Sequence, residues 1–280
     1  MAMRYVLKAL GEKLILVIPP GCISVIGSFP YPKRIFQRQG RKIPVQSMPL
    51  GSAAIGASGL KTGLIKRGDT ETEVVAFAGD GATYDIGLSG LSAAAERNED
   101  IIYVCYDNEL YGNTGAQRSS ATPWLAKTST NPYPAPKIEY KKDLISIMTA
   151  HRIPYLATAT IAYPDDMMRK VRKAKEITGF RFLLMLTPCV TGWLYRSEFT
   201  VEASRLAVET KIFPLLEIEN GTHITINKQP DGIPVSEYFK LQGRYQHLTP
   251  EEVARFQKTV DERWKRLKWS ANYIDRIGDE

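Results

Sequence analysis

Two polar residues, Asp80 and Asn108, each follow an apolar run and could together hold a ligand through a metal ion. Asp80 lies between Gly79 and Gly81, and glycines in such positions allow a tight turn and a close approach of the backbone to a ligand. A carboxylate, an amide oxygen and a nearby backbone carbonyl form a hard oxygen site. Such a site suits Mg²⁺, with phosphate oxygens and water completing the coordination. These residue types therefore indicate a diphosphate bound through a divalent cation.

The spacing of the two residues fits one crossover between parallel strands. Between Gly81 and Asn108 there are 26 residues, enough for a turn, a helix, a second turn and a strand. A right-handed crossover would bring Asp80 and Asn108 to the same edge of the sheet. A helix expected to begin near Ile86 would add its N-terminal N–H groups to the phosphate. Taken alone, Gly-Asp-Gly is more often an ordinary turn, so the hypothesis of a metal-bound diphosphate depends on Asn108 as well.

Two other phosphate-binding motifs are excluded. The chain contains no GxxxxGK[ST], so it has no P-loop. Residues 79–87 do not fit GxGxxG, because Tyr84 stands where the third glycine belongs.

The elements that must position these residues alternate between helix and strand. Strands alternating with helices of about ten residues predict a mostly parallel sheet with helices on both faces, which is an α/β fold. Ligands of such sheets bind outside the carboxyl ends of the strands. The patterns predict strands within 13–20, 73–79, 100–108, 155–162, 180–189 and 212–221, and helices within 1–11, 51–65, 87–98, 142–152, 164–179 and 201–210.

Two segments fall outside this alternation. Residues 112–140 are polar and rich in proline, and a long loop of this kind is usually functional or disordered. Residues 249–267 begin with a capping box and carry one apolar stripe. The stripe is expected either to pack on the body of the subunit or to meet a partner subunit. Its members are Val253, Phe256, Val260, Trp264 and Leu267.

Composition indicates an ordinary cytoplasmic globular protein. No run of about 18 apolar residues is present, and the first 13 residues do not form a secretory signal, so neither a membrane span nor export is expected. The net charge of +7 fits simple solubility or attraction to an acidic partner. Nucleic acid is not expected as a partner, because the basic residues are scattered. Three cysteines far apart in the sequence argue against a disulfide framework.

Segments spread over nearly the whole chain resemble the β subunits of 2-oxoacid:ferredoxin oxidoreductases, especially those of the pyruvate synthase type. The spacing from Gly-Asp-Gly to Asn resembles the binding motif of thiamine-diphosphate enzymes. The resemblance also rests on "GDGATYDIG", "YDNELYGNTGAQRSSATP", "HRIPYLATATIAYPDDMMRKVRKA", "LTPCVTGW" and "VSEYFKLQGRYQHLTPEE". It implies a thiamine-diphosphate-binding fold of the pyrophosphate-domain type over residues 1–248, with residues 249–280 as a C-terminal amphipathic helical extension.

The resemblance also implies roles for single residues. Asp80 and Asn108 would bind Mg²⁺ through their side chains and Leu110 through its carbonyl, while Gly79 and Gly81 would shape the turn around the diphosphate. Further residues of the site would lie on the loop that follows. There Asn113 and Thr114 would face the thiazolium and the substrate, and Gln117, Arg118 and Ser119 would lie over the site. Arg118 could equally be a solvated cation, and Cys105, inside a strand, is expected to be a core residue.

Enzymes of this family decarboxylate a 2-oxoacid on thiamine diphosphate, pass electrons singly to iron–sulfur clusters and transfer the acyl group to coenzyme A. The resemblance therefore implies ferredoxin as electron acceptor and α-, γ- and δ-type subunits as partners. The glutamate that activates the aminopyrimidine ring is expected from another subunit. Pyruvate is the expected substrate because residues 113–123 resemble the pyruvate synthase loop, with oxalate, 2-oxobutyrate or a branched 2-oxoacid left open.

The 4Fe–4S cluster of family β subunits needs four cysteines. Cys22 and Cys189 stand at two of the ligand positions, and the chain contains no CxxC to supply the other two. Two expectations follow: the start codon was assigned too late, or this variant lacks the cluster and the two thiols are simply buried. The uncapped helix at Met1 favours the first. A non-redox thiamine-diphosphate decarboxylase and a non-catalytic interaction subunit remain the alternative functions.

Overall fold

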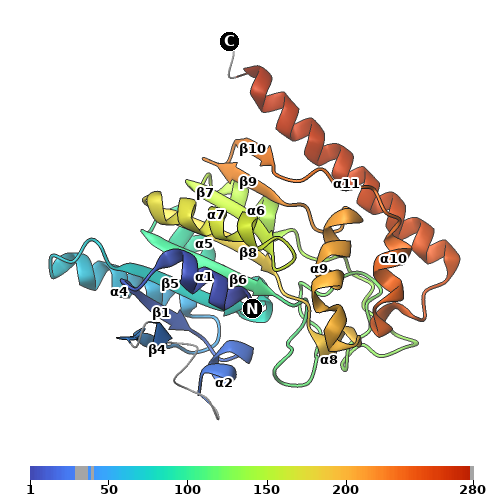
Figure 1. Cartoon of the computed structure of the whole chain (residues 1–280), viewed down its shortest axis with the longest axis horizontal. Helices are drawn as coiled ribbons and strands as arrows, with labels where there is room; N and C mark the ends of the chain where they lie inside the picture. The colour runs from blue at the N-terminus through green and yellow to red at the C-terminus, as the bar shows by residue number, and fades with distance from the viewer. Residues whose placement is uncertain (29–36, 39–40, 278–280) are drawn as a thin grey trace.

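The computed structural model describes residues 1–28, 37–38 and 41–277, and within them eight strands form one twisted sheet in the order β10-β9-β7-β8-β6-β5-β1-β4 (Figure 1). All neighbouring strands from β4 to β7 run parallel, whereas β9 is antiparallel to β7 and β10 to β9. The strands are β1 (Leu14–Ile18), β4 (Val45–Ser47), β5 (Glu73–Gly79), β6 (Ile101–Asp107), β7 (Tyr155–Thr160), β8 (Phe180–Leu186), β9 (Leu216–Glu219) and β10 (His223–Ile226).

Helices cover both faces of this sheet. Helices α1 (Ala2–Leu10) and α7 (Pro164–Glu176) lie on one face, and α4 (Ala53–Lys66), α5 (Leu88–Glu96) and α6 (Leu144–Ala150) lie on the other (Figure 1). The central strand β6 sends alternate side chains into two separate apolar cores. Burial on both faces explains why its sequence is a continuous apolar run rather than an alternating one. The predicted fold class and these five predicted helices are confirmed.

Shorter elements complete the chain, and sequence patterns missed them because each is too brief to show a period. They are α2 (Cys22–Ser28), β2 (Gln37–Arg38), β3 (Arg41–Lys42), the π-helix η1 (Gly81–Asp85), α8 (Val190–Trp193), the 3₁₀ helices η2 (Ser197–Phe199) and η3 (Gly243–Tyr245), and α10 (Val235–Lys240). The predicted helix α9 (Thr200–Glu209) is present. Residues 112–140 form no regular helix or strand, as predicted.

The C-terminal helix α11 (Pro250–Ile277) runs along one side of the molecule (Figure 1). Its predicted capping box is present: the Thr249 N–H donates to Glu252 Oε2 at 2.9 Å, and the Glu252 N–H donates to Thr249 Oγ1 at 3.2 Å. Within the apolar stripe, Val260 is 3% exposed and packs in the main core, with Phe256 against it. The stripe therefore packs on the body of the subunit. The division into domains at residue 248 stays a prediction.

None of the helices in the described part of the chain combines the length and the apolar composition needed to cross a bilayer.

Candidate functional site

The carboxyl ends of four adjacent strands meet at one edge of the sheet. Asp80 follows β5, Asn108 follows β6, Cys22 lies beyond the end of β1 and Cys189 beyond the end of β8. The register pairs Gly79 with Tyr106, so β5 and β6 end side by side. The predicted crossover therefore brings Asp80 and Asn108 to the same place.

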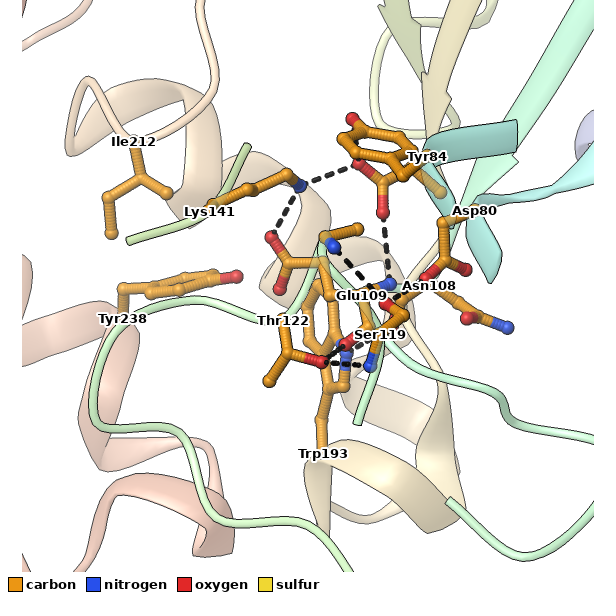
Figure 2. Close-up of polar contacts among 12 residues, drawn as sticks. Asp80, Tyr84, Asn108, Glu109, Ser119, Thr122, Lys141, Trp193, Ile212 and Tyr238 are labelled. Carbon is orange, nitrogen blue, oxygen red and sulfur yellow. Dashed lines mark hydrogen bonds and ion pairs between the residues drawn. The ribbon is translucent and has the colours of Figure 1, made fainter. Parts of the chain in front are cut away.

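The three predicted magnesium ligands lie together at this edge, and Figure 2 shows two of them, Asp80 and Asn108, beside each other. One side-chain amide atom of Asn108 lies 2.8 Å from Asp80 Oδ1 and 2.6 Å from the Leu110 carbonyl oxygen. An amide nitrogen at this position would donate a hydrogen bond to each oxygen. An amide oxygen there would complete a cluster of three oxygens, which a bound cation would stabilise. The spacing matches adjacent oxygens around Mg²⁺, which are about 3 Å apart when each lies at about 2.1 Å from the metal.

The surroundings of Asp80 are buried and carry excess negative charge. Asp80 is 1% exposed, and its Oδ2 accepts a hydrogen bond from Ser119 Oγ at 2.5 Å. Burial raises the pKa of Asp80 well above its ordinary value, and the charge of Asp107 raises it further. A bound divalent cation would reverse this effect by stabilising the carboxylate. Ser119, whose role the sequence left open, thus orients the central carboxylate of the site.

The helical segment after Asp80 differs from the prediction. It begins at Gly81 as η1, not near Ile86, and α5 follows at Leu88. Asp80 itself has helical dihedrals, with φ −58° and ψ −44°. The N-terminal N–H groups of this segment, which have no partner within the helix, therefore start directly beside the carboxylate.

The space beside Gly79 and Gly81 is occupied by aromatic side chains, which explains why these positions lack a side chain. Neither Gly79 nor Gly81 has a positive φ. A Cβ atom on Gly81 would lie 2.1 Å from the ring of Tyr111, and one on Gly79 would lie 3.2 Å from the ring of Tyr106. The glycines make room for aromatic side chains that wall the site. That Gly79 and Gly81 also shape the turn around the diphosphate stays a prediction.

A buried ionic network lies beside the site, and the sequence analysis missed it (Figure 2). Lys141 Nζ lies 2.6 Å from Asp107 Oδ2 and 3.0 Å from Glu109 Oε1, and Arg244 Nη2 lies 2.6 Å from Glu109 Oε2. The Tyr84 hydroxyl also donates to Asp107 Oδ2, at 2.9 Å. Burial lowers the pKa of Lys141, but Asp107 and Glu109 outweigh it and raise that pKa overall.

Charges in this network do not balance when Asp80 is included. Asp80, Asp107 and Glu109 are each at most 2% exposed and can carry three negative charges, against the two positive charges of Lys141 and Arg244. Buried charges are normally paired, so one carboxylate lacks a partner among these groups. A divalent cation between Asp80 and Asn108 would supply the missing positive charge.

One sequence signal could have pointed to this network. Asp107 and Glu109 flank Asn108 at the end of a fully apolar strand, where acidic side chains become buried and require cations. Nothing in the sequence indicated which basic residues would reach them. Lys141 lies outside the segments that carry the resemblance, and the segment that contains Arg244 does not indicate what this side chain contacts.

The loop after Leu110 leaves its predicted substrate residues accessible. Asn113 and Thr114 are exposed, and Thr114 Oγ1 donates to Gln117 Oε1 at 2.5 Å. Arg118 is 40% exposed and forms an ion pair with Glu139 at 3.2 Å. The structure does not bring Arg118 into the buried site, which agrees with the interpretation of a solvated cation.

Cys22 and Cys189 come to the same sheet edge as the site. Both are half-buried, and burial together with the charge of Cys189 raises the pKa of the Cys22 thiol. A Cβ on Gly112 would lie 3.5 Å from Cys22 Sγ and 3.1 Å from Asn108 Nδ2, so one glycine separates this thiol from the oxygen site. Cys105 is fully buried inside β6, as predicted. The 280 residues thus offer two thiols for a cluster, and the other two would have to come from outside them.

Comparison with protein families gives one match over more than half of the chain. The model of the family "Thiamine pyrophosphate enzyme, C-terminal TPP binding domain" matches residues 30–185. This range includes Asp80, Asn108 and Leu110.

Curated relatives match over nearly the full length. The chain is 47% identical to pyruvate synthase subunit PorB of Methanocaldococcus jannaschii, over 94% of this chain and 90% of that protein. It is 44% identical to ketoisovalerate oxidoreductase subunit VorB of Pyrococcus furiosus, over 96% of this chain and 88% of that protein. Among solved structures, a 2-oxoglutarate:ferredoxin oxidoreductase from Magnetococcus marinus has a similar fold. Its TM-score is 0.57 at 24% identity, over 68% of this chain and 61% of that one.

Proposed function

This chain belongs to the β subunits of the 2-oxoacid:ferredoxin oxidoreductases, a family of thiamine-diphosphate enzymes, and we propose that it binds the diphosphate through Mg²⁺. Asp80 Oδ1, the Asn108 amide oxygen and the Leu110 carbonyl would hold the metal. The observation that carries this proposal is that one amide atom of Asn108 lies 2.8 Å from Asp80 Oδ1 and 2.6 Å from the Leu110 carbonyl oxygen at the carboxyl edge of the sheet. The unbalanced negative charge around Asp80 supports it.

The residues of this chain bind and orient the cofactor in the proposal. Bound thiamine diphosphate would supply the carbanion chemistry by which a 2-oxoacid is decarboxylated. The N–H groups at the start of η1, beginning with Gly81, would face the diphosphate. Asn113 and Thr114 would face the thiazolium and the substrate, which is supported by their exposure on the loop directly after Leu110. Gly79 would keep the Tyr106 ring close behind the site.

Pyruvate is the substrate we propose, with coenzyme A as acyl acceptor and ferredoxin as electron acceptor. The relative named pyruvate synthase supports this choice. A branched 2-oxoacid is the second candidate, because a relative named ketoisovalerate oxidoreductase is almost equally similar.

The relatives are named as subunits, which supports a complex with further chains such as the α-, γ- and δ-type subunits. In that complex Cys22 and Cys189 would hold part of a 4Fe–4S cluster near the cofactor. Iron and sulfide analysis of the intact complex tests the cluster. Absence of both elements from an active complex would contradict it.

The proposed function is tested on the intact complex, purified without oxygen. Viologen reduction is measured with coenzyme A and pyruvate, 2-oxobutyrate, oxalate or ketoisovalerate. Reduction fastest with pyruvate is the expected result, and reduction fastest with ketoisovalerate would transfer the assignment to the branched acids. If no acid supports viologen reduction in a preparation that still binds thiamine diphosphate, the redox function is contradicted.

A further inference from the structure

The backbone between Asn108 and Leu110 has an unfavourable conformation. We define the metal-binding loop as residues 107–110. Its Glu109 has φ +66°, in the left-handed region that residues other than glycine rarely adopt. This conformation lets the side chain of Asn108 lie against the carbonyl of Leu110. The side chain of Glu109 points away from Asn108, toward Lys141 (Figure 2). A conformation of this kind persists only when surrounding contacts hold it.

Contacts from three other segments hold Glu109. Its N–H donates to Asp107 Oδ1 at 3.0 Å, and its carbonyl accepts from Thr122 Oγ1 at 2.7 Å. Its carboxylate, in a residue 2% exposed, pairs with Lys141 at 3.0 Å and with Arg244 at 2.6 Å. Every polar group of Glu109 is therefore engaged, and these partners are residues other than the three expected metal ligands.

Arg244 reaches the metal-binding loop by two routes. It is 1% exposed, and one route is its ion pair with Glu109. Its guanidinium also lies 4.0 Å from the ring centroid of Trp193, whose Nε1–H donates to the Asn108 carbonyl at 2.8 Å. The side chain is fixed further by Gln242 Oε1, which accepts from Arg244 Nε at 2.8 Å. Arg244, which is distant from the loop in the sequence, thus contacts it at Glu109 directly and at Asn108 through Trp193.

We propose that the ion pair of Glu109 with Arg244 is a positioning device, which sets the metal affinity of this site by holding the loop in its ligand geometry. The inference rests on the proposed magnesium site. Neither residue would touch the metal, so both would act through Asn108 and Leu110. Partners that orient metal ligands in this way typically change metal affinity when they are replaced.

A purely structural role of the pair is the alternative, since breaking a buried ion pair also destabilises a fold. The two roles differ in one measurable quantity, the Mg²⁺ concentration needed for half-maximal binding of thiamine diphosphate. Loss of stability alone leaves this concentration unchanged in the protein that remains folded. Loss of loop geometry raises it, and higher Mg²⁺ then restores binding.

The experiment uses the intact complex stripped of cofactor, with equilibrium dialysis of thiamine diphosphate across a series of Mg²⁺ concentrations. Arg244→Met and Glu109→Gln should each raise the half-maximal Mg²⁺ concentration about ten-fold or more. Arg244→Lys retains the charge but not the planar fork, so a smaller increase is expected. Glu109→Gly accepts the positive φ without strain and should fold well, yet it should also raise this concentration because it lacks the carboxylate.

Glu217→Gln is the matched control. Glu217 is a carboxylate that is 3% exposed and paired with Arg169 at 2.9 Å, on β9 in the outer part of the sheet. This variant should lower the melting temperature but keep the half-maximal Mg²⁺ concentration within about two-fold of the original protein. A ten-fold increase in the control would overturn the inference, because the effect would then not be specific to the loop.

Asp80→Ala separates failure of the inference from failure of the proposed site. If Asp80→Ala abolishes Mg²⁺-dependent binding while Glu109→Gly and Arg244→Lys bind as the original protein does, the positioning role is wrong and the metal site stands. If Asp80→Ala also binds normally, the proposed metal site itself is wrong.

Discussion

Two buried carboxylates, Asp80 beyond the end of β5 and Glu217 on β9, differ in how completely their charge is satisfied. Glu217 accepts hydrogen bonds from the Tyr155 hydroxyl at 2.7 Å, from Arg169 at 2.9 Å and from Asn227 Nδ2 at 2.8 Å. Burial alone would raise the pKa of Glu217, but these donors outweigh it and lower the pKa to about 2. Asp80 has one hydroxyl donor, from Ser119, and burial holds its pKa well above the ordinary value.

The difference separates a structural carboxylate from one suited to a ligand. Residues within the chain complete the surroundings of Glu217, so its charge stabilises the fold. Asp80 is as deeply buried, and its Oδ1 lies 2.8 Å from a side-chain amide atom of Asn108, which is not a cationic group. A buried charge without a partner destabilises the folded state, and such sites are typical of function.

Neutralising Asp80 should produce the largest effect. Asp80→Asn retains the shape of the side chain but removes the charge, so we expect Mg²⁺-dependent affinity for thiamine diphosphate to fall about 100-fold or more. The melting temperature without cofactor should stay equal or rise, because an unpaired buried charge disappears. Equilibrium dialysis and thermal unfolding measure the two quantities. Unchanged affinity, or a clear fall in the melting temperature without cofactor, would show that Asp80 is a structural carboxylate like Glu217.

Protonation of Glu217 by acid should destabilise the fold, whereas neutralising Asp80 should not. Its pKa of about 2 in the folded state lies below the ordinary value of 4.5, so its contribution is complete above pH 4.5 and is lost as the pH falls toward 2. The loss should approach about 3 kcal/mol of unfolding free energy. Denaturant unfolding from pH 5 to pH 2.5 measures it. Glu217→Gln should make this pH dependence shallower, and a slope equal to that of the unmodified chain would show that other groups cause it.

Removing the Ser119 hydroxyl, which donates a hydrogen bond to Asp80, should have a moderate effect. Ser119→Ala leaves Asp80 Oδ2 without its 2.5 Å hydrogen bond, and the carboxylate can then rotate away from Asn108. A hydrogen bond to a charged group contributes about 1.5 kcal/mol, so cofactor affinity at fixed Mg²⁺ should fall about ten-fold. Ser119→Thr keeps the hydroxyl and serves as the control. Equal affinities of the Ala and Thr variants would show that the bond does not orient Asp80.

The smallest effect is expected from the exposed pair of Arg118 and Glu139, whose side chains are 40% and 61% exposed. Solvent screens such pairs, so Arg118→Ala should change the free energy of unfolding by less than about 0.5 kcal/mol. Measured KM values for pyruvate then decide its function. A KM equal to that of the original complex fits a solvated cation, whereas an increased KM would place Arg118 over the substrate.

The sequence by itself determined the fold class and the central pair of the site. Apolar runs that are buried on both faces must lie within a covered sheet, and their alternation with helices requires parallel crossovers. Asp80 and Asn108 at the ends of two consecutive strands therefore had to meet at one edge. These conclusions depend on local patterns and on one short-range connection, which a sequence records directly.

Tertiary structure alone decided how the site is held. The ion pair of Glu109 with Arg244 joins residues 135 positions apart, and no pattern in the sequence links the two partners. The start of η1 at Gly81, and the aromatic rings that exclude a side chain there, also depend on packing between distant segments. Burial turns ordinary acidic residues into charges that require specific partners, and which partners arrive is settled only when the chain folds.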